Sequence, residues 1–358
     1  MKKLFIAIAA VALVASASCT KVNPEEKTAE KVTFSVANYV PATKAGEVSF
    51  LNEFATGVTP QFKCKAYMKG VGVTGMQDFF GTNETITWNA TAKEWAPSHT
   101  YYWPKDAASY VNFFSWYDTG VGPDVVTNGT MEWNNRTIAT GDNIMYAGPA
   151  WHFQKNTNAA KYGLDGVTEG VPTLFNHALS QIEFKAYATK TSVEGLLSWT
   201  IKLADVKIGK IFNQGTLKLA STEPAETVLN QQGAWNGTPA WTTTGTASGE
   251  LTPADLTVTA TTKATAQTLL ANQSVLPQDL TNVNITLNLD ITTTYTEGQT
   301  NHEIIPVTIP LTDFTPTAWE LNKKYTYYIK VSPAENKVLF DPAVESAWTA
   351  VDAGEKTL

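Results

Sequence analysis

The residues best suited to metal binding or nucleophilic catalysis are few in this chain and widely spaced. They are four histidines and two cysteines, namely His99, His152, His177, His302, Cys19 and Cys64. None of the histidines falls in a metal-binding spacing such as HxxxH or HxxE, and the cysteines are too few to complete a zinc site. We therefore expect no metal ion and no cofactor.

Motifs that bind phosphate or carry a catalytic serine are missing from the sequence. The chain has no GxSxG, no Gly-rich phosphate loop and no kinase signature. The stretch from Gly70 to Gly75 matches GxGxxG by spacing, but nothing after it reads as a helix. We therefore predict a turn there.

Four carboxylates lie within one region, and two carboxylates on either side of a bond are what a glycosidase needs. They are Asp118, Asp124, Glu132 and Asp142. An acidic chain offers many such combinations by chance, so we interpret them as solvated loop residues and expect no enzyme. The alternative, a secreted hydrolase, would degrade a polysaccharide.

Aromatic residues are frequent, with 11 Trp and 13 Tyr. An exposed aromatic ring can stack on a sugar, which leaves open a surface glycan-binding lipoprotein as an alternative function. However, Trp88, Trp95, Trp103 and Trp116 lie in or beside strand-like segments at the spacing of core residues. We therefore expect these four to pack in the core.

The charge balance argues against nucleic acid as a partner. The chain carries 26 basic and 33 acidic residues, a formal net charge of −7. No basic stripe is present that would neutralise phosphates.

The first residues are typical of an export signal. Lys2 and Lys3 precede an unbroken apolar run from Leu4 to Ala15, which is too short to span a bilayer. Cys19 follows it, although the usual lipoprotein box has Leu where Ser16 stands. We predict a signal peptide at residues 1–18 and lipidation of Cys19; a plain signal peptide with an incidental Cys19 is the alternative.

The rest of the chain reads as short strands separated by turns. Val32 to Val36 alternates apolar and polar residues, and Tyr110 to Tyr117 is a run of aromatic and β-branched residues. No segment is typical of a helix longer than two turns. The pattern predicts an all-β protein with two β-sandwiches, at residues 45–172 and 173–358, joined by a Gly-rich stretch.

Several motifs follow one another in a fixed order along most of the chain. They are the signal with Cys19, Ala42-Thr43-Lys44-Ala45 after the first strand, Thr100 to Pro104 before Val111 to Tyr117, Phe175 to Phe184, Val275 to Gln278, Trp319 to Tyr327, Phe340-Asp341-Pro342 and Trp348. In this order they resemble the fimbrillin family of the Bacteroidales, the FimA/Mfa-like pilins and their minor subunits.

The resemblance implies two tandem transthyretin-like antiparallel β-sandwich domains and a structural subunit of a cell-surface fimbria that supports adhesion. Such a subunit is exported as an outer-membrane lipoprotein. Its partners would be other fimbrial subunits, in a head-to-tail homopolymer or a mixed fimbria, and a ligand on a host or bacterial surface.

The resemblance also implies how the subunit assembles. In this family a trypsin-like protease removes the first strand, and a donor strand from a neighbour fills the open sheet edge. Here the cut would fall between Lys44 and Ala45, where Porphyromonas pilins have arginine, so that residues 19–44 form a lipidated tether and removable first strand. The family's donor corresponds to the C-terminal segment, Val344 to Leu358.

Overall fold

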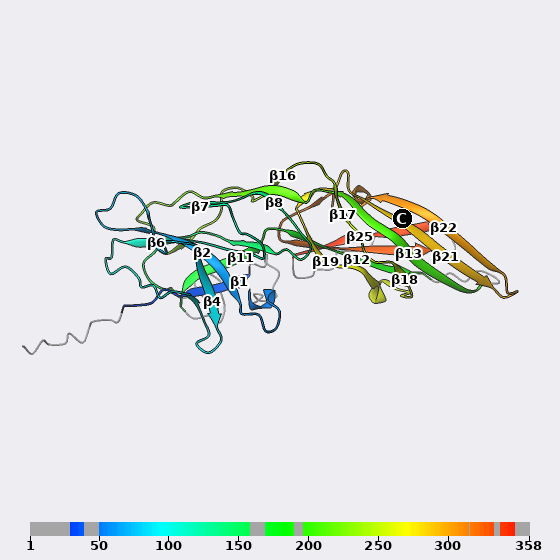
Figure 1. The fold of residues 1–358 in the computed structure, drawn as a ribbon, viewed down its shortest axis with the longest axis horizontal. Coiled ribbons are helices and arrows are strands. Elements are labelled where there is room, and N and C mark those ends of the chain that lie inside the picture. Colours follow the sequence, from blue (N-terminus) through cyan, green and yellow to red (C-terminus); the bar gives the residue numbers. More distant parts are fainter. Residues whose placement is uncertain are drawn as a thin grey trace, which may run out of the picture.

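The computed structural model describes residues 29–38, 50–157, 169–189, 196–314, 316–332 and 337–347 of the 358-residue chain. It is an elongated all-β molecule in which the blue and cyan strands of the N-terminal part lie at one end and the orange and red strands at the other (Figure 1). In the described residues the helical elements are three short 3-10 turns, η1 (Phe50–Glu53), η3 (Lys263–Thr265) and η4 (Leu311–Asp313). No described helix is long and apolar enough to cross a membrane.

The N-terminal part is built on a ten-stranded sheet. Its order is β15 (Gln231–Gln232), β10 (Ala150–Phe153), β6 (Tyr110–Asp118), β9 (Ile144–Ala147), β11 (Val171–His177), β1 (Phe34–Asn38), β5 (Glu94–Pro97), β4 (Glu84–Asn89), β2 (Gln61–Lys69) and β3 (Gln77–Asp78). Strand β2 also pairs with β6. The sheet therefore closes into a ring of β6, β9, β11, β1, β5, β4 and β2, and we call this the N-terminal ring.

Strand β6 shows why an aromatic run forms the centre of this part. Successive side chains of a strand point to opposite faces. Accordingly Val111 and Phe113 face the core inside the ring, whereas Phe114 and Trp116 face a second core outside it. A strand buried on both faces reads as a continuous apolar run, as predicted for Tyr110 to Tyr117.

The second core lies between the ring and a four-stranded sheet. That sheet consists of β16 (Trp241–Thr243), β14 (Gln214–Ala220), β8 (Thr130–Thr137) and β7 (Val125–Thr127). The predicted domain boundary after residue 172 falls inside β11, and strands from both sides of it pair, β14 with β8 and β15 with β10. The strand pairings therefore do not follow that boundary.

The C-terminal part consists of two sheets around one core. One has the order β19 (Gln267–Val275), β12 (Ser180–Ala188), β24 (Lys323–Ser332) and β25 (Lys337–Ala347). The other has the order β17 (Gly249–Leu251), β13 (Leu196–Ile211), β21 (Asn284–Tyr295) and β22 (Thr300–Pro310), with β18 (Leu256–Val258) on β13. A two-stranded pair, β20 (Gln278–Asp279) and β23 (Ala318–Trp319), completes the described strands.

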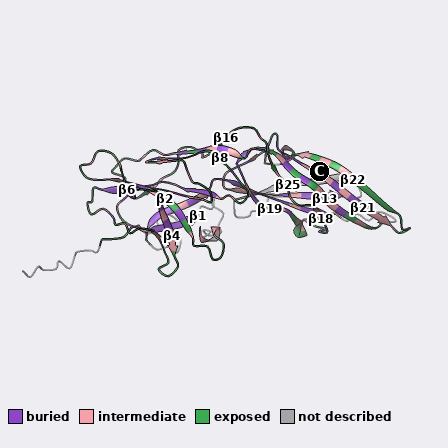
Figure 2. Ribbon diagram, viewed as in Figure 1, coloured by how far each residue is buried: buried purple, intermediate pink, exposed green. Residues whose placement is uncertain are grey.

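Burial alternates along these C-terminal strands, as Figure 2 shows by its purple and pink bands on β13 and β21. In β21 the buried residues are Ile285, Leu287, Leu289 and Ile291. A period of two with one apolar face is the pattern of a strand that covers a core on one side. The transthyretin-like topology of both parts stays a prediction, and the main sheet of the N-terminal part closes on itself instead of forming a simple sandwich.

The β7–β8 turn gives a prediction about contact across the predicted boundary. Gly129 has φ +105°, and a Cβ there would lie 2.7 Å from the backbone oxygen of Ser221. Gly141 has φ +84° with open space around its Cβ position. We expect Gly141→Ala to lower the free energy of unfolding by about 1–2 kcal/mol, because alanine disfavours positive φ, and Gly129→Ala to lower it by more. Equal losses in urea denaturation would contradict the contact with Ser221.

Candidate functional site: the groove that holds the first strand

Strand β1 is the first described strand of the chain and occupies an interior position in the N-terminal ring. It pairs in parallel with β11, from Phe34 opposite Val171 to Asn38 opposite Phe175. On its other side it meets β5 in the antiparallel pair of Phe34 and Trp95. Because both partners lie much later in the sequence, β1 could leave without carrying another strand with it. The space between β5 and β11 that it fills is called the β1 groove below.

Three side chains of this segment reach the core inside the ring. Val32, Phe34 and Val36 are all buried there. The ring of Phe34 meets Phe62 and Phe113 edge to face, with centroid distances of 5.7 and 5.6 Å. Complete burial of one such side chain contributes about 1.5–3 kcal/mol, so these three hold β1 in place by several kcal/mol.

The side-chain amide of Asn156 binds the backbone at the start of this segment. Its Nδ2 donates to the carbonyl of Lys31 (2.7 Å) and its Oδ1 accepts from the N–H of Thr33 (3.2 Å). The indole Nε1 of Trp103 donates to the same Oδ1 and fixes its direction. This contact involves only backbone atoms of the bound strand, so it would serve any extended segment in the groove.

Gly170 lies directly against the backbone of β1. A Cβ at this position would lie 2.7 Å from the carbonyl carbon of Phe34 and 2.9 Å from the nitrogen of Ser35. No side chain fits there without moving β1. The next residue, Val171, donates its N–H to the carbonyl of Thr33 (2.8 Å).

The chain after the predicted cut is fixed to the ring by η1. Phe50 stacks on Phe175 with a centroid distance of 4.5 Å and an interplanar angle of 16°, and it also contacts Phe62 and Trp95. Phe50 is 1% exposed. The segment downstream of Lys44 is therefore anchored in the same core as β1.

A polar contact supports the aromatic one at the end of η1. Glu53 Oε1 lies 3.4 Å from His177 Nε2, and Glu53 Oε2 accepts from Asn143 Nδ2 at 2.9 Å. Asn143 Oδ1 lies 3.1 Å from the other ring nitrogen of His177. The carboxylate of Glu53 is thus linked to β11 at the point where that strand ends.

The predicted site residues themselves lie outside the described residues. Cys19 precedes residue 29, and Lys44 and Ala45 fall between the end of β1 and the start of η1. Of the predicted donor segment, Val344 to Ala347 is the end of β25 and pairs with β24, opposite Thr326 to Lys323. The remainder, from Trp348, lies outside the described residues.

Cys64 is buried inside the ring and is a free cysteine. Burial raises the pKa of its thiol to about 12. A protonated, inaccessible thiol is unreactive. Its reactivity would therefore report whether the interior of the ring is open to solvent.

The four histidines each lie beside one carboxylate. The pairs are His99 with Glu84 (3.2 Å), His152 with Glu223 (3.1 Å), His177 with Glu53 (3.4 Å) and His302 with Asp290 (2.9 Å). In the part of the chain that the structure describes, no three His, Cys, Asp or Glu residues are grouped so that they could hold a metal ion.

The four carboxylates of the glycosidase alternative have structural partners. Arg136 Nη2 lies 3.2 Å from both Asp118 and Asp142. Asp118 is 1% exposed at its side chain and also accepts from Trp133 Nε1. The interpretation of these residues as solvated is therefore wrong for Asp118, because the chain buries it as the counter-ion of Arg136.

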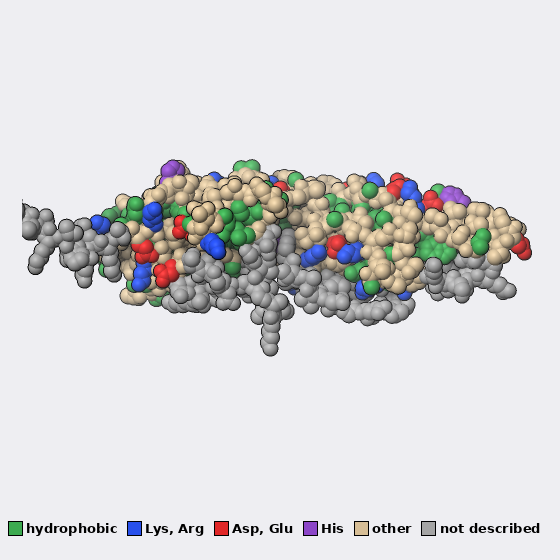
Figure 3. Space-filling view, turned by 90° about the horizontal axis from the view of Figure 1, so that it is seen from below, with side chains coloured by type: hydrophobic (Ala, Val, Ile, Leu, Met, Phe, Trp, Pro, Cys, Tyr) green, Lys and Arg blue, Asp and Glu red, His purple; other side chains and the backbone are tan. Residues whose placement is uncertain are grey.

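The tryptophans predicted to pack in the core do so. Trp95, Trp103 and Trp116 are buried, and the half-buried Trp88 contacts Trp95 with a centroid distance of 5.5 Å. Trp95, Trp103 and Trp116 therefore have no exposed face for a sugar, whereas Trp88 is half-buried. On the face seen in Figure 3, acidic and basic side chains are interspersed without a continuous basic stripe.

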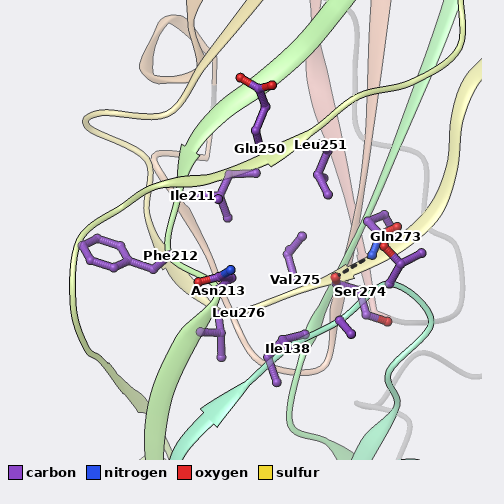
Figure 4. A pocket seen from close by; sticks show the side chains of 13 residues that line it. Ile138, Ile211, Phe212, Asn213, Glu250, Leu251, Gln273, Ser274, Val275 and Leu276 are labelled. Carbon is purple, nitrogen blue, oxygen red and sulfur yellow. Dashed lines mark hydrogen bonds between the residues drawn. The ribbon is translucent and has the colours of Figure 1, made fainter.

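A pocket of about 200 Å³ lies where the N-terminal and C-terminal parts meet (Figure 4). Ile138, Ile211 and Val275 contribute apolar side chains to it, and Glu250 points away from its centre. Glu250 instead forms an ion pair with Lys207 (3.1 Å). The pocket therefore brings no pair of carboxylates together.

Two residues that contact the backbone of β1, Asn156 and Gly170, were not predicted from the sequence. The turn η1 was not predicted either. An asparagine that binds a strand backbone, such as Asn156, has no sequence signature. Gly170 falls in the stretch predicted as a join between domains. For η1 the signal is the close spacing of Phe50, Leu51 and Phe54, all of which pack on the core inside the ring.

Solved structures of a fimbrial protein and of two candidate cell adhesion proteins align with most of this chain. A fimbrial protein of Bacteroides vulgatus has a TM-score of 0.51 at 15% identity, over 89% of this chain and 99% of its own. Candidate cell adhesion proteins of Bacteroides uniformis and Bacteroides ovatus have TM-scores of 0.43 and 0.44 at 18% and 12% identity. These alignments cover 89% and 90% of this chain and 99% of each of those proteins.

No curated protein matches this chain. The family model described as fimbrillin-like matches residues 56–346, about four fifths of the sequence. A match of this extent includes most strands of both the N-terminal and the C-terminal part. The chain therefore belongs to the fimbrillin-like family.

Proposed function

We propose that this chain is a subunit of a cell-surface fimbria that assembles when β1 leaves and a strand of a neighbouring subunit takes its place. The observation that carries the proposal is the position of β1, a short strand at the start of the chain that closes the N-terminal ring. Without β1, the edges of β5 and β11 have unpaired backbone groups next to the apolar core inside the ring. Such an edge is a template for a strand of another chain.

Proteolysis controls the exchange because it removes a tether. Before the cut, β1 is joined to η1 by residues 39–49 and competes for its groove as part of the same molecule. A short tether corresponds to an effective concentration of about millimolar, which an external strand does not exceed. Once the chain is cut, β1 becomes a separate peptide and a donor can replace it.

Lys44 is the basic residue whose cleavage frees β1. A cut after Lys31 would leave the core residues of β1 attached, and the next basic residue, Lys63, lies within β2. Arg136 is the only arginine of the chain and is held by two carboxylates. The proposal therefore requires a protease that accepts lysine, with Ala45 as the new N-terminus.

The donor in this proposal is the C-terminal segment, and because Val344 to Ala347 pair with β24, residues 348–358 are the part proposed to exchange. Each subunit then offers one donor and one groove, and a head-to-tail contact of this kind builds an open filament. The filament could be a homopolymer or include other fimbrial subunits. Acylated Cys19 would hold the precursor at the outer membrane, and the assembled fimbria would support adhesion to a surface ligand.

The first prediction concerns the cut. In a Cys19→Ser protein, Cys64 is the only thiol, and we expect it to be unreactive before digestion with a lysine-specific protease. After digestion the thiol should react and detergent-resistant ladders should form on a gel. Lys44→Ala should block both changes, whereas Lys31→Ala, the matched control, should permit both. Cleaved protein that stays monomeric with a protected thiol would contradict the exchange.

The second prediction concerns the donor. A chain that ends at Ala347 keeps all of β25 and lacks the last eleven residues, so its C-terminal sheet should remain intact. After the cut it should lose β1 and expose Cys64 like the full chain, but it should form no ladders. Ladders equal to those of the full-length protein on the same gel would exclude the C-terminal segment as donor.

The third prediction concerns the packing of Phe34 on the core inside the ring. Phe34→Ala removes the central buried ring of β1, a change that typically lowers stability by about 3–5 kcal/mol. We expect it to let Cys64 react in the uncut protein. Phe184→Ala, which removes a buried ring stacked on Tyr327 in the C-terminal core, should lower the unfolding midpoint but leave the thiol protected. Equal thiol protection in both variants would show that Phe34 does not hold β1.

A further inference from the structure

The side of β1 that faces away from the interior of the ring carries small residues. Ser35 and Ala37 are 0% and 3% exposed. In the register of the sheet they lie beside Pro172 and Leu174 of β11. The hydroxyl of Ser35 is buried on this side, and it has no hydrogen-bond partner in the structure.

Thr33, two residues earlier on the same side, offers a direct comparison. Its hydroxyl donates to the backbone oxygen of Glu169 at 3.0 Å. One segment thus places two hydroxyls beside the same neighbouring chain and satisfies only one of them. Serine is therefore not required at position 35 to hold the strand by a hydrogen bond.

The local packing prevents Ser35 from finding a partner by a small shift. The backbone nitrogen of Ser35 lies 2.9 Å from where a Cβ of Gly170 would stand. On the other side of the strand, Phe34 is fixed between Phe62 and Phe113. The strand is held at this register from both sides, and in this position Ser35 Oγ has no hydrogen-bond partner.

A buried hydroxyl without a partner has given up hydrogen bonds to water, and it regains them when the strand leaves. The unpaired hydroxyl therefore favours departure of β1. Two further features act in the same direction: β1 pairs with β11 in parallel, the less stable arrangement, and its register with β5 is a single pair.

We propose that the unpaired hydroxyl of Ser35 weakens the binding of β1 in its groove, so that a donor strand can replace it. The partner that fits is an extended strand of a second copy of this chain. A donor residue without a side-chain hydroxyl at the register position of Ser35, such as Ala350 or Ala353, would leave no unpaired hydroxyl there. This inference rests on the proposed function and adds a physical reason why the donor strand replaces β1.

The test uses the exported chain cut after Lys44, with release of the β1 peptide followed by mass spectrometry of the size-fractionated protein. Ser35→Ala removes only the hydroxyl and should slow release about tenfold, which corresponds to a typical contribution of one hydrogen-bonding group. Thr33→Val is the matched control: valine has nearly the shape of threonine but lacks its hydroxyl, which here has a hydrogen-bond partner. This variant should therefore speed release. Both variants make the strand more apolar, so an effect of apolarity alone would change the release rate in the same direction. Opposite changes in the release rate would therefore be due to hydrogen bonding.

A second measurement keeps the test decisive if a variant is cleaved poorly. In the uncut chain, Ser35→Ala should raise the urea midpoint and Thr33→Val should lower it. Release from Ser35→Ala as fast as from the unaltered protein, with no rise in midpoint, would overturn the role of Ser35 and leave the proposed function intact. An unaltered β1 peptide that never leaves after the cut would overturn the proposed function, and this inference with it.

Discussion

The N-terminal part of this protein depends on one constraint, which is that both edges of a strand inside a closed sheet must be paired. Between β5 and β11 that requirement is met by β1, which pairs with β11 along all five of its residues and with β5 at Phe34. The same five residues supply Phe34 and Val36 to the core inside the ring. Loss of β1 would therefore remove the backbone pairing and the apolar packing at this position at the same time.

The chain on either side of the predicted cut is fixed by different means. Upstream, β1 is held by its own buried side chains and by the amide of Asn156. Downstream, η1 is held by Phe50 in the same core and by Glu53 at the end of β11. A cut between them would separate a segment that can leave from one that stays and keeps part of the core filled.

The individual strands could be predicted from the sequence because their side-chain pattern is local. The aromatic run of β6 appears where the sequence predicts it, and β21 shows the period of two that is typical of a strand with one buried face. Closure of the ring could not be predicted in the same way. It depends on pairing between residues that are far apart in the chain, such as Phe34 and Val171, and neither strand specifies its partner by pattern alone.

The two parts of the candidate site differ in predictability for the same reason. The alternation from Val32 to Val36 indicates a strand with one apolar face, and a basic residue after it indicates where that strand could be cut. The groove is contributed by later segments. Glycine suggests a flexible join, yet Gly170 is there because the backbone of β1 passes too close for a Cβ. That role depends on a long-range contact, which composition does not reveal.

A subunit that is to accept a strand at one groove must not accept it elsewhere. Among the described strands, the edges of the two N-terminal sheets are β15, β3, β16 and β7, each two or three residues long and therefore poor templates. The long edge strand β22 contains Pro306 and Pro310, which have no N–H to donate to an incoming strand. In contrast to these short or proline-containing edges, β11 has seven residues next to the apolar core inside the ring. It is paired with β1 along five of them. Loss of β1 would therefore create an edge of a kind that the rest of the N-terminal part avoids.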